Sequence, residues 1–133
     1  MNLFSKIFGD SDNKDNQQTA IQWNELTDLK QLDELVSESF SKPVFIFKHS
    51  TRCSISRMAL KNFEKYYSVE NASANFLDLL SYRNISNEIA DWFGVIHQSP
   101  QLILLIDGKC AYTVSHSDID AEELKVRIGE HIK

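Results

Sequence analysis

The hydrophobic pattern of the first half of the chain changes period several times, and each change predicts a new element. A short strand is expected around residues 23–26. Apolar side chains then recur at helical spacing behind a possible cap at Thr27: Leu29, Leu32, Val36 and Phe40. Pro43 breaks this helix, and the dense apolar run at 44–47 is typical of a central strand buried on both faces.

The polar turn at 49–52 precedes a second helical pattern. A helix is therefore predicted to begin near Cys53, with four apolar residues on its inner face: Ile55, Ala59, Phe63 and Tyr66. Apolar and polar residues tend to alternate over 75–79, which predicts a strand. A third helix is predicted over 85–93, because Gly94 stands where helices commonly end.

The last third of the chain predicts an antiparallel hairpin and a closing helix. The apolar run 101–106 and the returning segment 109–114 are separated by Asp107-Gly108, a two-residue turn. An acidic first turn then favours a terminal amphipathic helix with three apolar positions: Leu124, Ile128 and Ile132. This order of elements indicates an α/β fold, with a central mixed sheet flanked by helices.

Length and composition narrow the class of protein. With 133 residues, 42% of them hydrophobic, the chain can bury a single core. The formal net charge of -5 argues against nucleic acid as a partner, because phosphate backbones need a basic face. No run approaches the roughly 18 uncharged apolar residues of a membrane helix, so no membrane span is expected.

The N-terminal segment differs from the rest in composition. Residues 9–19 are almost entirely polar and cannot offset the entropy of ordering. We therefore predict a flexible, disordered extension and linker over 1–20 and a domain over 21–133. Residues 1–8 carry a few apolar side chains, either a docking element or a frayed end, and are too short for a signal peptide. A cytoplasmic location is the default expectation.

The two cysteines lie in different surroundings, which does not fit a secreted disulfide framework. A thiol reacts as its thiolate, and a helix N-terminus at Cys53 would stabilise that charge. Arg52 beside it and Arg57 one turn later add positive charge. Cys110 stands in a strand pattern without such help and is interpreted as a small buried hydrophobe. The alternative for Cys53 is an inert, partly buried thiol in a turn.

Two segments resemble thioredoxin. Residues 88–105, EIADWFGVIHQSPQLILL, are similar in spacing to the thioredoxin stretch that runs from the second crossover helix into the cis-proline strand. The approach to Cys53 is similar too, but Ser56 stands at the position of thioredoxin's second cysteine, which makes this a monothiol motif. The resemblance implies a thioredoxin-like fold in which Pro100 is cis and faces Cys53. It also implies that Ser99 offers its backbone to an extended client chain by β-augmentation.

The segment 47–56, FKHSTRCSIS, resembles the signature of the YtxJ-type monothiol bacilliredoxins. The matching positions are Lys48, His49, Ser50, Thr51, Arg52, Cys53, Ile55 and Ser56. Ser54 departs from the family's pattern, which has a proline there that would rigidify the first helical turn. Ser115-His116 also resembles that family, so the likeness covers 23–133.

This resemblance implies removal of the small thiol bacillithiol from protein mixed disulfides. The Cys53 thiolate would attack the small-thiol sulfur, free the client protein and keep the small thiol as a cap. Because Ser56 cannot resolve the cap, a second small thiol or a partner dithiol would recycle the protein. Bacillithiol is thus the expected co-substrate, with no bound cofactor. Thiolated client proteins and a reductant are the expected partners.

Several neighbours of Cys53 have both a functional and an ordinary interpretation. Ser56 either hydrogen-bonds the thiolate or faces solvent. His49 and His116 are either general acids or hydrogen-bonded structural histidines. Four cations could pair with the malate carboxylates of bacillithiol or simply be solvated at the surface: Lys48, Arg52, Arg57 and Lys61.

Other classes of function stay open on the sequence. A thioredoxin-fold binding module would keep the peptide groove without turnover. An iron–sulfur carrier needs one cysteine per chain and an external thiol, although the glycine and phenylalanine of the CGFS motif of monothiol glutaredoxins are missing. Peroxide sensing by Cys53 is not separated from repair. No C-x-x-C or H-x-x-x-H pair is present, so a structural zinc site is not expected.

Overall fold

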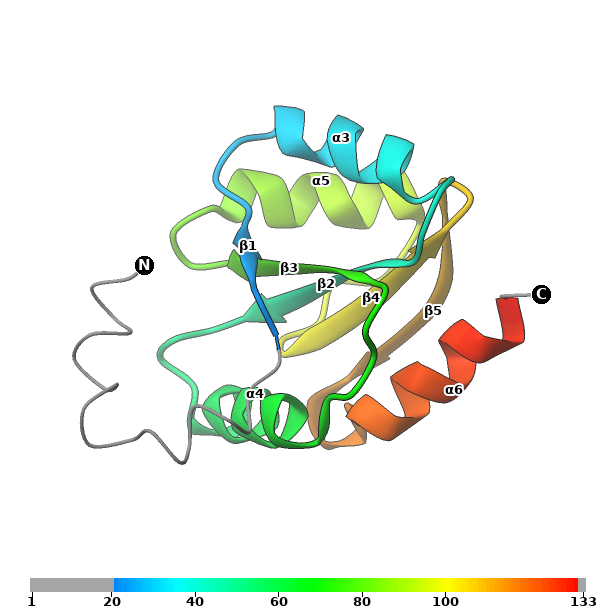
Figure 1. Ribbon diagram of the computed structural model, residues 1–133. Helices are drawn as coiled ribbons and strands as arrows, with labels where there is room; N and C mark the ends of the chain where they lie inside the picture. The colour runs from blue at the N-terminus through cyan, green and yellow to red at the C-terminus, as the bar shows by residue number, and fades with distance from the viewer. Residues whose placement is uncertain (1–20, 132–133) are drawn as a thin grey trace.

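The computed structural model describes residues 21–131, which form a five-stranded sheet between two layers of helix (Figure 1). The predictions for residues 1–20 and for Ile132 lie outside the described residues. The elements follow in the order β1 (Asn24–Glu25), α3 (Lys30–Glu38), β2 (Val44–His49), α4 (Ser54–Tyr66), β3 (Ser73–Asp78), α5 (Arg83–Phe93), β4 (Gln101–Ile106), β5 (Lys109–Ser115), the 3-10 turn η1 (His116–Asp118) and α6 (Ala121–His131).

The sheet has the mixed topology that the order of elements predicts. Its strands lie in the order β1-β3-β2-β4-β5; β2 pairs in parallel with β3 and antiparallel with β4. Every residue of β2 is buried, because helices cover both faces of the central strand. Phe45 and Phe47 pack towards α4 and α6, whereas Val44 and Ile46 pack towards α3 and α5. The predicted central strand and the β4–β5 hairpin are confirmed.

Helix α3 begins differently from the prediction. Its N-cap is Leu29 rather than Thr27, and the Asp28 carboxylate accepts the backbone N–H of Lys30 at 2.9 Å. The Gln31 side chain accepts the N–H groups of Thr27 and Asp28. The Thr27 cap is therefore wrong, because acceptors from Asp28 and Gln31 already satisfy the first free N–H groups of this turn.

The buried face of α4 agrees with the prediction at Ala59 and Phe63 but differs from it at both ends. Ile55 and Tyr66 are 57% and 54% exposed, while Ser56, Phe63 and the following Tyr67 are buried. These buried positions are spaced as one face of a helix, so the stripe starts at a serine rather than at an isoleucine. A stripe whose first member is polar cannot be recognised from hydrophobic periodicity alone.

Helix α5 ends as the sequence predicts. Gly94 adopts a left-handed conformation with φ of 67°, and Ile85 and Ile89 are buried under the helix. Within residues 21–131, no helix is long and apolar enough to cross a membrane.

Candidate active site

Strand register brings three distant segments to one end of the sheet. Lys48 pairs with Gln101, and Gln101 pairs with Ser115. The turn to Cys53 follows β2, Pro100 precedes β4 and His116 follows β5, so all three leave the sheet at neighbouring positions. The His116 N–H donates to the Pro100 carbonyl at 3.0 Å, which ties two of these segments together.

Cys53 is the N-cap of α4 and a free, half-buried thiol. Its N–H donates to the Ser50 carbonyl at 3.2 Å, and its own carbonyl accepts the N–H of Arg57 at 3.0 Å. The Arg57 guanidinium turns back to donate to the Thr51 carbonyl at 3.1 Å, while Arg52 is exposed. The predicted helix N-terminus is confirmed, and the unpaired N–H groups of the first turn there favour a negative sulfur.

Ser56 lies on the first turn of the same helix and is completely buried. Its Oγ accepts the N–H of Ser50 at 3.0 Å and lies 2.8 Å from Nδ1 of His49. The interpretation of Ser56 as a solvent-facing residue is wrong, because β2 and the 50–53 turn enclose its hydroxyl. Its buried contact is with a histidine.

His49 is the last residue of β2 and is 5% exposed. Burial lowers the pKa of its imidazole, the nearby Asp78 carboxylate raises it, and Arg57 lowers it again. Asp78 is the register partner of His49 on β3. Its Oδ2 accepts the Ser81 hydroxyl at 3.0 Å, whereas its buried Oδ1 has no hydrogen-bond partner within residues 21–131. His49 is therefore a buried, neutral base beside a carboxylate.

Lys48, on the opposite face of β2, is also completely buried. Its Nζ donates to Nδ1 of His97 at 2.7 Å, and the Ser86 hydroxyl lies 3.2 Å from the same nitrogen. Burial lowers the pKa of Lys48 to about 8. Lys48 is not a surface cation, so both interpretations of it are wrong: it is neither solvated at the surface nor placed to pair with malate carboxylates. Lys48 shares its face of β2 with Val44 and Ile46, but this spacing becomes informative only once the strand is known to extend beyond the apolar run.

The loop before β4 carries Ser99 and Pro100. The Ser99–Pro100 peptide bond is cis, and Pro100 is buried. The Ser99 hydroxyl oxygen is buried without a partner, and no residue in the described part of the chain hydrogen-bonds to the Ser99 backbone. The backbone groups that β-augmentation would use are thus unpaired here.

The remaining sequence candidates lie apart from the thiol or at the surface. Cys110 is half-buried on β5, where burial raises the pKa of its thiol, partly offset by its hydrogen bond to the Tyr112 carbonyl. This placement fits the interpretation of a buried hydrophobe. His116 is exposed, with a positive φ of 57°.

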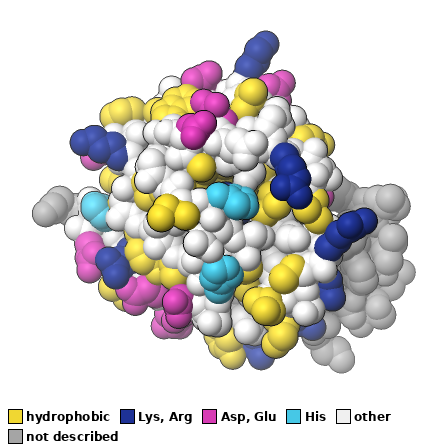
Figure 2. Space-filling model, turned by 180° about the vertical axis from the view of Figure 1, so that it is seen from behind, with side chains coloured by type: hydrophobic (Ala, Val, Ile, Leu, Met, Phe, Trp, Pro, Cys, Tyr) yellow, Lys and Arg dark blue, Asp and Glu magenta, His cyan; other side chains and the backbone are white. Residues whose placement is uncertain are grey.

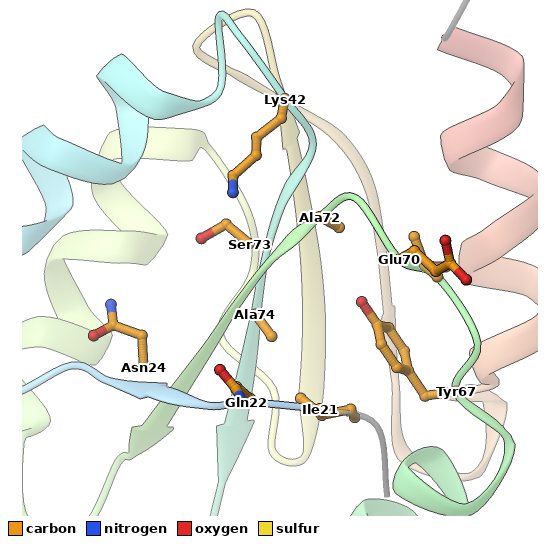
Figure 3. A pocket seen from close by; sticks show the side chains of 10 residues that line it. Ile21, Gln22, Asn24, Lys42, Tyr67, Glu70, Ala72, Ser73 and Ala74 are labelled. Atoms are coloured by element: carbon orange, nitrogen blue, oxygen red, sulfur yellow. The ribbon is translucent and has the colours of Figure 1, made fainter.

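Two of the surface hollows formed by the described residues lie beside the sheet at different places. One, of about 410 Å³, is lined by Ile21, Tyr67 and Ala72 among others (Figure 3). It includes Ser73, the register partner of Val44 at the start of β2, so it lies at the opposite end of that strand from the Cys53 turn. The other, of about 450 Å³, lies between the segment 93–98 and β5. Figure 2 shows histidine side chains among hydrophobic and uncharged ones on the face that Figure 1 hides.

The described residues offer no candidate site for a bound metal ion. Residues 21–131 contain no group of three or more histidine, cysteine, aspartate or glutamate side chains able to hold a metal ion.

Comparison with known proteins identifies the family and the fold. Residues 24–124 match the family model of the monothiol bacilliredoxin BrxC. A solved structure described as having a thioredoxin fold is 28% identical with a TM-score of 0.70, covering 79% of this chain and 92% of that one. Thioredoxins of Malassezia sympodialis and Trypanosoma brucei brucei are 19% and 14% identical, with TM-scores of 0.65 and 0.66. They cover 85% and 82% of this chain, and 93% and 89% of their own chains, and share its fold.

Proposed function

Because the chain belongs to the monothiol bacilliredoxin family, we propose that it removes bacillithiol from protein mixed disulfides through Cys53. Family and fold together support a thiol oxidoreductase role. The observation that carries the proposal is the pairing of one N-cap thiol, Cys53, with a buried Ser56 on the same helical turn. A cytoplasmic location, where thiols stay reduced, belongs to the same proposal.

The reaction is an exchange of one disulfide for another. The Cys53 thiolate attacks the sulfur of the small thiol, the bond between that sulfur and the client breaks, and the client leaves as a thiolate. Cys53 then carries the small thiol in a new disulfide. A second small-thiol molecule attacks this cap, which yields the free small-thiol disulfide and returns Cys53. No net electrons are gained or lost in either exchange.

The surroundings of Cys53 suit a protein client. Ile55 and Met58 follow Cys53 on α4 and are 57% and 66% exposed, so they offer apolar contact near the thiol. The unpaired Ser99 backbone can hold an extended segment beside them. Arg52 and the tethered Arg57 are the cations placed to meet the malate carboxylates of the cap.

The proposal is tested by mixing reduced protein with a bacillithiol-capped client and measuring intact masses. The small-thiol mass should move to the wild type and to Cys110→Ala but not to Cys53→Ser. Client binding without any mass transfer would favour a non-catalytic binding module instead.

A further inference from the structure

Ser56 contacts His49 and lies one helical turn after Cys53. Cys53 is the N-cap of α4 and Ser56 is the third helical residue, a spacing of three positions that makes side chains neighbours on a helix surface, although no hydrogen bond joins these two side chains in the described residues. On its other side the Ser56 hydroxyl lies 2.8 Å from Nδ1 of His49. The hydroxyl therefore links the reactive end of the helix to the end of β2.

The hydrogen bonds at Ser56 Oγ leave one lone pair of the hydroxyl oxygen without a partner. A hydroxyl has one proton and two lone pairs, and one lone pair accepts the Ser50 N–H at 3.0 Å. When His49 is neutral and accepts at Nδ1, the hydroxyl proton is directed to His49. The second lone pair is then available to the S–H of a protonated Cys53.

His49 has the surroundings of a base that accepts a proton transiently. Burial keeps its ring neutral, while the Asp78 carboxylate opposes this by favouring the imidazolium. The groups that face it are Arg57 and Ser56 from α4, and Asp78 and Phe76 from β3. Asp78 Oδ1 is buried without a hydrogen-bond partner in the described residues, so the carboxylate can compensate a charge that appears on the ring.

We infer that Ser56 and His49 form a proton relay for Cys53, with Asp78 as a positioning and charge-balancing residue. The Cys53 S–H gives its proton to Ser56 Oγ as the Ser56 hydroxyl proton passes to His49 Nδ1. The products are a Cys53 thiolate hydrogen-bonded by Ser56 and an imidazolium balanced by Asp78. When Cys53 leaves its cap as a thiolate, the two transfers run backwards. The relay rests on the proposed function in one respect, that Cys53 is the reacting thiol.

The pH profile of Cys53 alkylation tests the relay without any bacillithiol. The rate constant for iodoacetamide is measured by intact mass from pH 5.5 to 9.5 in a Cys110→Ala background. Ser56→Ala is compared with Ser54→Ala, a matched control at an exposed serine on the same turn. The relay predicts that Ser56→Ala loses at least about tenfold near pH 6.5 and converges with its parent at high pH, where hydroxide removes the thiol proton directly. His49→Gln should reproduce this profile.

A Ser56→Ala profile that superimposes on that of Ser54→Ala overturns the relay, as does an equal loss at every pH, which would indicate a structural role. Should the variants fail to fold, the wild type still decides. The NMR titration midpoint of the His49 ring is compared before and after Cys53 is capped with methyl methanethiosulfonate. A shift of the midpoint supports the relay and an unchanged midpoint overturns it. Alkylation that follows the relay while bacillithiol transfer is absent would refute only the proposed function.

Discussion

Two buried polar clusters begin on adjacent residues of β2 and lie on opposite faces of the sheet. The first, His49 with Ser56, packs under α4 and the Cys53 turn. The second, Lys48 with His97 and Ser86, packs against α5 and the loop that leads to Pro100. Both end at the same edge of the sheet, yet their chemistry differs. In the α4 cluster a hydrogen bond joins a neutral imidazole and a hydroxyl. The α5 cluster instead buries a cation, Lys48, that forms no ion pair with the described residues.

The difference indicates that the two clusters have different roles. A hydroxyl and an imidazole can exchange protons with a thiol at little cost, so the α4 cluster suits proton transfer to and from Cys53. A buried ammonium without a carboxylate destabilises the fold. Its hydrogen bond to His97 fixes the segment before the Ser99–Pro100 bond, so the α5 cluster suits positioning of the loop that we propose to hold the client. Five substitutions separate these roles.

The largest change is expected from Ser56→Cys in the α4 cluster. A second thiol would then stand at the third helical position and attack the capped Cys53, because the two side chains share a face of α4. The product is an internal disulfide, seen as a loss of two hydrogens in the intact mass, and the small thiol is released without added reductant. A cap that persists on Cys53 in this variant would show that the two positions do not meet.

Lys48→Met in the α5 cluster is expected to stabilise the protein. Because burial lowers the pKa of Lys48 from 10.5 to about 8, the charged form opposes folding by up to about 3 kcal/mol at pH 7. This cost is complete below pH 8 and disappears as pH rises towards 10.5, where the unfolded chain also loses the proton. Urea unfolding at pH 7 and pH 9.5 should therefore show an advantage for Lys48→Met that shrinks at the higher pH. An advantage that stays constant would contradict the buried charge.

The two histidines are expected to differ in their effect on rate. Replacing His49 by Gln should slow Cys53 exchange about tenfold or more at pH 6.5, because it removes the base. His97→Gln removes a partner of Lys48 and should leave the rate of reaction with a small, unstructured disulfide within about twofold. Stopped-flow exchange with glutathione disulfide measures both. Equal losses in the two variants would remove the distinction between the clusters.

The smallest effect is expected from Ser86→Ala. Its hydroxyl makes one 3.2 Å contact with His97, so the free energy of unfolding should fall by about 1 kcal/mol or less, without a change in exchange rate. Thermal unfolding followed by circular dichroism provides the check. A loss of several kcal/mol would mean that Ser86, rather than His97, is the main support of Lys48.

The hydrophobic pattern is sufficient to predict the positions of elements whose buried residues are apolar. The run at 44–47, the Asp107-Gly108 turn and the helix before Gly94 all appear where the periodicity predicts them. The position of Cys53 at a helix N-terminus follows from the change of pattern after 49–52.

Residues that are polar and buried could not be assigned in this way. Lysine is usually found at the surface, and Lys48 is buried only because it lies in a strand that is covered on both faces. Ser56 opens the buried stripe of α4 but carries no hydrophobic signal. No local pattern points to His97, because its role depends on Lys48, which lies 49 positions away in the sequence.

The most direct test of the account is the stoichiometry of client release in the absence of free small thiol. Reduced protein is mixed with an excess of bacillithiol-capped client, and released client thiol is counted per chain. A monothiol mechanism at Cys53 predicts that the reaction stops after one client per chain, with the cap located on the Cys53 peptide, and resumes when bacillithiol is added. Continued release without added thiol, or a disulfide between Cys53 and Cys110, would contradict it.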